Sequence, residues 1–174
     1  MKKVLRIARV ELSILFYSPI AWLVLIIFMI QCGVTFTDII AKFETSQQLN
    51  NAMKSLTVNT FGGREGLFAA VQSKLFLYIP LLTMGLMSRE ISSGSIKLLL
   101  SSPVTTFEII IGKFVAMMAY GFLLISVLLV IMVAAGISIE FLDIKFIAGG
   151  LLGLYLLICA FSAIGLFMSS LTSY

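Results

Sequence analysis

The 174-residue chain contains no histidine, only three prolines, two cysteines and one tryptophan, and charged residues make up just 11% of it. Without histidine the chain lacks the side chain that serves most often as a general base and as a metal ligand, which argues against a histidine-dependent hydrolase or metal enzyme. Cys32 and Cys159 show no metal-ligand spacing and are expected to be small, buried, apolar residues. Charge is so scarce that an ordinary soluble domain, with roughly 25% charged residues, is excluded.

What the chain has in abundance is apolar side chains, which make up 60% of its residues. A soluble core of this size could not hide so much apolar surface, so the natural solvent of the chain is lipid. The net charge is +4, but the basic residues are scattered or lie beside apolar segments. That distribution is typical of a membrane surface, and no nucleic-acid partner is expected.

Four apolar segments are long enough to cross a hydrocarbon core, which takes about 20 residues. They cover residues 19–36, 66–88, 114–139 and 146–171, and a polar outer loop fills residues 37–65. Lys74 interrupts the second segment. We expect it to snorkel to the outer interface, and the alternative is a segment completed by protein contacts. Pro80 is expected to kink the same helix.

Residues 1–18 predict a separate amphipathic helix lying in the membrane interface. At helical spacing, one face carries Lys2, Arg6, Arg9, Ser13 and Tyr17, and the other carries Leu5, Ala8, Leu12, Leu15 and Phe16. The pair Ser18-Pro19 favours a break before the first span. The alternative is that these residues are simply the solvated, basic start of that span.

Residues 89–113 lie between the second and third spans and predict a short helix outside the hydrocarbon core. Residues 92–95 are rich in serine and glycine and break the preceding helix. Residues 96–100 form a short apolar piece interrupted by Lys97, which Ser101, Ser102 and Pro103 stop. Thr105 and Glu108 then have capping-box spacing and restart a helix. The alternative is an ordinary polar loop.

The charges predict the orientation in the membrane. Basic residues outnumber acidic ones on the side that holds both ends of the chain and residues 89–113, whereas the two signs balance on the other side. By the positive-inside rule, both ends and residues 89–113 are expected in the cytoplasm.

No catalytic chemistry is expected, and neither a cofactor nor a metal. Gly112-Lys113 is not a phosphate-binding loop, because Phe107 stands where its first glycine must be. The polar residues inside the spans are expected to hold helices together, and they are Gln31, Thr83, Ser126 and Ser162. Gly149 and Gly153 form a G-x-x-x-G pair that predicts close helix packing, either within the chain or along a dimer seam.

Residues 89–113 resemble the segment between the second and third spans of ABC-2-type transporter permeases. The matching features, in order, are Glu90, Gly94, Leu98–Leu100, Ser102-Pro103, Glu108 and Gly112-Lys113. In that family the segment is a coupling helix that docks in a groove of the ATPase subunit. The resemblance therefore implies an ATPase-coupling role for Glu90, Gly94, Ile96, Lys97, Leu98, Leu99, Pro103, Glu108 and Lys113. The amphipathic start and residues 163–172 are also similar to the family.

The resemblance implies an all-α membrane protein, with an N-terminal interfacial helix, four transmembrane helices and a coupling helix. It implies a permease subunit that exports a substrate across a bacterial cytoplasmic membrane, driven by a separate ATP-binding-cassette subunit and working with a second permease copy or paralogue. The alternative is a non-transporting scaffold, as in gliding-motility or copper-enzyme-maturation complexes. Since family members generally have six spans, we expect residues 1–174 to be a truncated piece.

Overall fold

The computed structural model describes residues 2–48, 61–63, 66–92, 105–138 and 143–171. Within these ranges the regular structure is helical throughout, which confirms the predicted all-α class. The helices are α1 (Lys2–Tyr17), α2 (Pro19–Gln48), α3 (Leu67–Ser92), α5 (Thr106–Ser138) and α6 (Ile144–Leu171).

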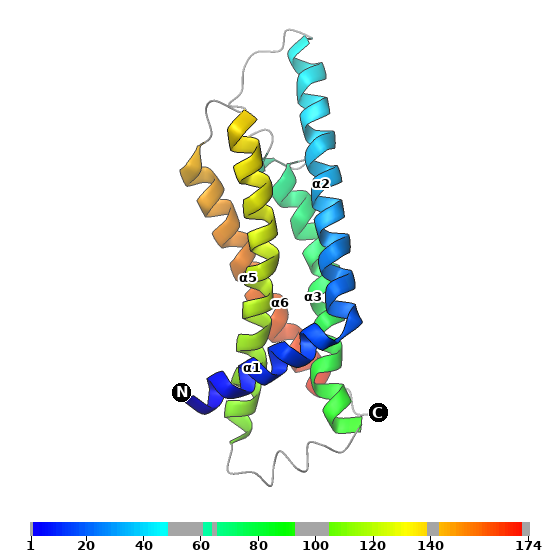
Figure 1. The fold of residues 1–174 in the computed structure, drawn as a ribbon, viewed down its shortest axis with the longest axis vertical. Helices are drawn as coiled ribbons and strands as arrows, with labels where there is room; N and C mark the ends of the chain where they lie inside the picture. Colours follow the sequence, from blue (N-terminus) through cyan, green and yellow to red (C-terminus); the bar gives the residue numbers. More distant parts are fainter. Residues whose placement is uncertain (1, 49–60, 64–65, 93–104, 139–142, 172–174) are drawn as a thin grey trace.

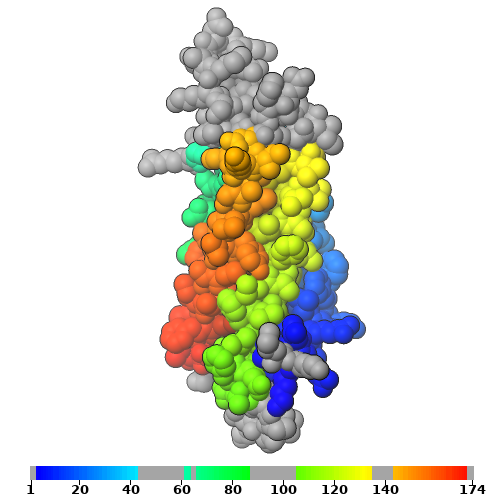
Figure 2. Space-filling model, turned by 90° about the vertical axis from the view of Figure 1, so that its left-hand side faces the viewer, coloured from blue at the N-terminus to red at the C-terminus, as the bar shows by residue number. Residues whose placement is uncertain are grey.

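Helices α2, α3, α5 and α6 run alongside one another as an elongated bundle, and α1 crosses the lower end of that bundle at a steep angle (Figure 1). The end of α3, the start of α5 and the end of α6 lie at the same end as α1. Figure 2 shows α5 and α6 side by side along the molecule, with α1 against the first turns of α5. The predicted arrangement of spans plus a crosswise first helix is therefore the observed one.

Four described helices contain segments long and apolar enough to cross a membrane: Pro19–Lys42, Leu67–Leu86, Thr106–Ala134 and Ile144–Leu171. All four of these helices extend beyond the predicted spans, and α2 and α5 extend furthest. Helix α2 continues past residue 36 to Gln48, through alanine, lysine, glutamate and glutamine, which are good helix formers. Helix α5 begins at Thr106, where the cap at Thr105 was predicted to restart a helix, and it continues into the third span without a break.

The break between α1 and α2 falls at Ser18, as predicted, and is held by local contacts. The Ser18 amide donates to the Ile14 carbonyl at 3.1 Å and ends α1. The Trp22 indole of α2 donates to the Phe16 carbonyl at 2.8 Å, and the Phe16 and Trp22 rings lie 5.7 Å apart. Ordered contacts on both sides of Ser18 make the turn a defined corner.

The four spans pack around a common core. Its fully buried members include Phe28 of α2, Ile79 of α3, Leu124 of α5 and Ile158 of α6. Side chains that point outward from the spans are also largely apolar, such as Trp22 at 51% exposed. An apolar outer surface suits lipid, and polar groups would have to face the interior.

The glycines that permit close packing are not the predicted pair. Gly149 and Gly153 are exposed, and a Cβ atom at either would meet nothing within 4 Å, so they do not pack against another described part of this chain. The close approach of α6 to α3 occurs instead at Gly165, where a Cβ atom would lie 2.8 Å from Thr83 Cβ, and at Gly150 beside Phe68. The packing role of Gly149 and Gly153 was predicted from their spacing alone, and the rotation of α6 about its axis turns both glycines outward. Their other predicted role, at a dimer seam, stays a prediction.

Candidate functional site: the α1–α3–α5 junction

Helices α1 and α5 pack closely at the lower end of the bundle, and Gly112 makes that approach possible. A Cβ atom at this position would lie 2.5 Å from Ile7 Cγ2 and 2.9 Å from Ile7 Cβ. No larger residue fits without moving α1, because real Cβ atoms essentially never approach so closely. The contact brings the buried face of α1, which carries Ala8, Glu11 and Leu15, against the first turns of α5.

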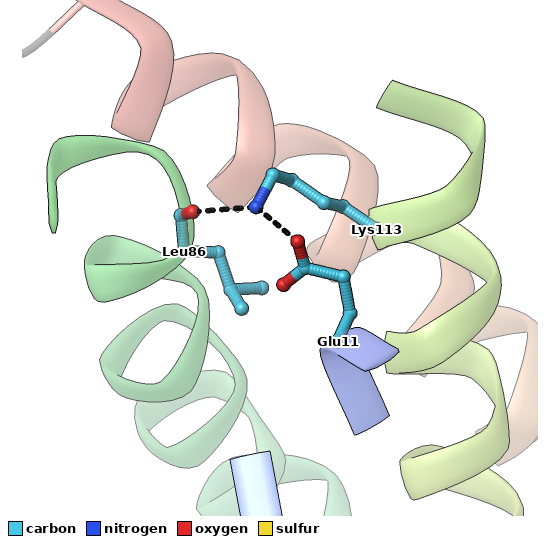
Figure 3. Close-up of polar contacts among 3 residues, drawn as sticks. All are labelled: Glu11, Leu86 and Lys113. Atoms are coloured by element: carbon cyan, nitrogen blue, oxygen red, sulfur yellow. Dashed lines mark hydrogen bonds and ion pairs between the residues drawn. The ribbon is translucent and has the colours of Figure 1, made fainter. Parts of the chain in front are cut away.

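At this crossing a buried ion pair joins the two helices. The Lys113 ammonium of α5 lies 2.7 Å from the Glu11 carboxylate of α1 and also donates to the Leu86 carbonyl of α3 at 3.0 Å (Figure 3). The side chains of Lys113 and Glu11 are only 1% and 10% exposed. One ammonium group thus links three helices at the end of the bundle where α3 ends and α5 begins.

Because the ion pair is buried, breaking it would cost much more free energy than breaking an exposed ion pair. Two opposite charges that leave water together lose much of their hydration, and each then depends on the other for compensation. Removing one partner of such a pair typically costs about 3–5 kcal/mol, because it leaves an unpaired charge inside the protein. Helices α1, α3 and α5 are therefore held in a fixed relation at this point.

The start of α5 is also capped as predicted. The Thr105 amide donates to the Glu108 carboxylate at 3.1 Å, and the Glu108 amide donates to the Thr105 hydroxyl at 3.3 Å. This reciprocal arrangement satisfies backbone donors that the first turn cannot satisfy itself. It fixes the residue at which the chain re-enters a helix after the segment that follows α3.

The residues predicted to couple to an ATPase fall into two groups. Glu90 lies in α3 near its end, and Glu108 and Lys113 lie in the first turns of α5. The others lie outside the described residues, and they are Gly94, Ile96, Lys97, Leu98, Leu99 and Pro103. The structure therefore places both helices that flank the predicted coupling helix at the α1 end, and leaves that helix itself a prediction.

Lys113 does not lie on the surface, as a residue that docks directly on a partner would. Its ammonium group is turned inward, to Glu11 and Leu86. Sequence reasoning did not identify Glu11 as the partner of Lys113. The signal was its position, three residues after Ala8 and four before Leu15, which puts a carboxylate on the apolar face of α1.

Two cavities flank the ion pair. One, of about 330 Å³, lies between the start of α5 and the end of α6 and is lined by Lys113 among mostly apolar side chains such as Ile110 and Phe167. The other, of about 150 Å³, lies beneath the α1–α2 corner and is lined by Glu11 together with residues of α3 such as Leu82. The junction is therefore packed tightly at the ion pair and loosely on either side of it.

Other polar contacts also join the spans. Ser169 of α6 donates to the Met84 carbonyl of α3 at 2.9 Å, and Tyr120 of α5 donates to the Ala21 carbonyl of α2 at 2.8 Å. Of the four polar residues expected to hold helices together, only Gln31 bonds to another helix, and Ser162 Oγ is buried without a partner in the described part of the chain. Thr83 and Ser126 bond to carbonyls of their own helices.

Lys74, which we expected to snorkel to the outer interface, makes contacts with α2. Its ammonium group donates to Thr35 Oγ1 at 2.6 Å and to the Gln31 carbonyl at 3.2 Å, both on α2. The alternative, a span completed by protein contacts, describes this lysine better. The neighbouring helix offers two oxygen acceptors, and the ammonium group binds both.

The geometry defines a class of protein: a multi-pass α-helical membrane protein with an amphipathic helix fixed across one end of its spans. The chain belongs to the family described as ABC-2 family transporter protein, whose family model matches residues 5–173. No curated protein matches the chain. No solved structure matches it either. The family establishes a permease-type membrane component, and its members act in general with an ATPase partner.

Proposed function

We propose that this chain is the permease subunit of an ABC-2-type exporter in a cytoplasmic membrane, driven by a separate ATP-hydrolysing subunit that docks on residues 89–113. The observation that carries the proposal is the junction at Lys113. This residue joins α5 to α3 and α1 at the end of the bundle where the chain leaves α3 and enters α5. A force applied to the segment between those two helices acts directly on the ends that the junction joins.

The chemistry of the junction suits a mechanical role. A buried ion pair is stable while it is intact and costly to separate, so the three helices it connects move together rather than one at a time. The α1 helix would convert that movement into a tilt at the membrane surface, because Lys3, Arg6 and Arg9 are exposed on its outer side. The exposed basic residues also favour a cytoplasmic location for this end.

The length of α5 supports the same arrangement. It has 33 residues, which corresponds to about 50 Å at 1.5 Å per residue, whereas a hydrocarbon core is about 30 Å thick. Part of α5 therefore extends beyond the core. Because α1 packs on its first turns, that end can present the segment before it to a soluble subunit.

The proposal is tested by changing the predicted docking surface. Leu98→Asp or Leu99→Asp would put a carboxylate into an apolar contact, and a buried unpaired charge costs several kcal/mol. We expect the variants to insert normally but to lose co-purification with the ATPase subunit and to lose transport-linked ATP hydrolysis. Because about 1.4 kcal/mol already corresponds to a tenfold change in affinity, binding of the ATPase subunit should weaken by at least about tenfold.

The control is Ser46→Asp near the end of α2, which lies at the opposite end of the bundle and should change neither property. If the leucine variants keep partner binding and transport at wild-type levels, the segment is not a coupling helix. A role as a non-transporting scaffold would then be the better description.

A further inference from the structure

Lys74 is a cation inside a membrane-spanning segment, and it plays no part in the junction at Lys113. It lies on α3 within the span Leu67–Leu86, about 10 Å along the helix from Leu67 at 1.5 Å per residue. Its side chain is half-buried. Ionisable residues inside membrane-spanning segments are rare and generally serve a function.

In the part of the chain that the structure describes, no carboxylate forms an ion pair with Lys74. Asp38 lies further along α2, is exposed and forms no ion pair with it. The partners of the ammonium group are two neutral oxygens, Thr35 Oγ1 and the Gln31 carbonyl. Among the described residues, its positive charge is thus solvated by neutral oxygens alone.

Two hydrogen-bond donors of this cluster remain unused. The ammonium group has three N–H groups and uses two of them. Gln31 Oε1 accepts from the Tyr78 hydroxyl, which leaves the amide nitrogen of Gln31 to donate, and the Thr35 hydroxyl already donates to the Gln31 carbonyl. A fixed positive charge with spare donors is complementary to an anionic oxygen group.

Below this cluster the bundle presents an apolar strip to the lipid. Leu77 and Leu81 follow Lys74 on the same side of α3, at three and seven residues, and are 64% and 50% exposed. On α2, Ile27 lies one turn from Gln31 and is 37% exposed. Helices α2 and α3 lie side by side along this length (Figure 1). The strip runs from Lys74 toward the α1 end, into the depth of the bilayer.

We propose that Lys74 and Gln31 bind the phosphate group of an anionic phospholipid whose acyl chains lie along this strip of α2 and α3, with Thr35 holding the Lys74 ammonium in place. A charged donor cluster above an exposed apolar strip matches a headgroup above its tails. The surface is one that bilayer lipid itself contacts, so the ligand needs no separate entry path. The assignment does not depend on coupling to an ATPase.

The experiment uses the full chain, purified in detergent and incubated with phosphatidylglycerol or phosphatidylcholine of identical acyl chains, and counts retained lipid by native mass spectrometry. Both lipids carry a phosphate, but the quaternary ammonium of phosphatidylcholine is repelled by Lys74. We expect the wild type to retain phosphatidylglycerol preferentially. Lys74→Met should lose that preference by about tenfold, the effect of one charge-assisted hydrogen bond, and Lys74→Arg should keep it.

Lys145→Met is the matched control, since it removes an equal charge from an exposed site at the same end of the bundle. An equal loss in this control, or an unchanged preference in Lys74→Met, would overturn the proposal. If Lys74→Met fails to fold, Gln31→Leu keeps the cation and removes the amide donor, and it must still reduce the preference. Displacement of the lipid by millimolar inorganic phosphate would assign the cluster to free phosphate and overturn the lipid assignment.

Discussion

The Glu11–Lys113 pair shows how much one buried contact between distant residues constrains this chain. The two residues are 102 positions apart, yet the Lys113 ammonium lies 2.7 Å from the Glu11 carboxylate and is nearly excluded from solvent. Neither charge could remain buried without the other. At the scale of single residues, the burial of each of these two charges therefore depends on the other, and paired variants can test this dependence.

Lys113→Met leaves the Glu11 carboxylate buried without its lysine, and we expect it to reduce the free energy of unfolding by about 3–5 kcal/mol. Glu11→Gln should also destabilise, whereas the double variant Glu11→Gln/Lys113→Met should be more stable than Lys113→Met alone. Thermal unfolding of the purified proteins in detergent measures all three. Arg6→Met, which removes an exposed charge from the same helix, should stay within about 0.5 kcal/mol of wild type. Additive losses in the double variant would show that the two side chains do not depend on each other.

At the scale of elements, the position of α1 depends on a contact that only glycine allows. Ile7 of α1 occupies the space where a side chain at position 112 would begin, and part of that contact is with Ile7 Cβ, which cannot move without its backbone. Overpacking of this kind forces backbone shifts that cost about 1–3 kcal/mol. The same substitution at Gly153, where nothing lies within 4 Å, has no such consequence inside the chain.

Gly112→Val is accordingly expected to displace α1 from α5 and weaken the ion pair one residue away. Faster amide hydrogen exchange in α1, with the spans protected as before, is the predicted result. Gly153→Val should leave exchange in α1 unchanged, and a change in oligomeric state caused by that variant alone would support a dimer seam at Gly149 and Gly153. Equal exchange in wild type and Gly112→Val would mean that the glycine is not needed for docking.

At the scale of the whole molecule, the described helices form a bundle with one end marked by α1 and the basic residues on its outer side. An amphipathic helix at a steep angle to the spans lies along the membrane surface when the spans cross it. The positive-inside rule then predicts that the α1 end faces the cytoplasm.

Two single-cysteine variants, made in a chain in which Cys32 and Cys159 have been replaced, test that orientation. Ser13→Cys is on the exposed side of α1, and Ile144→Cys is at the opposite end, at a position 77% exposed. Ile144→Cys should react with a membrane-impermeant thiol reagent in intact cells, and Ser13→Cys only after permeabilisation. Reversed labelling would move the junction to the outer side, where no ATPase subunit could reach it.

The sequence by itself determined those features that neighbouring residues decide. Apolar runs of sufficient length specify spans wherever lipid is the solvent. The corner at Ser18 and the reciprocal cap between Thr105 and Glu108 are made by residues within a few positions of each other, so their spacing was enough to predict them. Hydrophobic periodicity likewise separated α1 from the spans and placed Leu5 on its apolar face, where this side chain is 62% exposed.

The tertiary structure decided which faces of those helices meet. The rotation of each helix about its axis is set by packing against neighbours far away in the chain, and spacing alone cannot supply it. That rotation turns Gly149 and Gly153 outward and Gly165 inward, brings Lys74 to oxygens of α2, and places Glu11 against Lys113. The hydrogen bonds of Lys74 and Lys113 to other helices join residues 39 and 102 positions apart. Lipid drives helices into the bilayer but does not specify which of their sides touch.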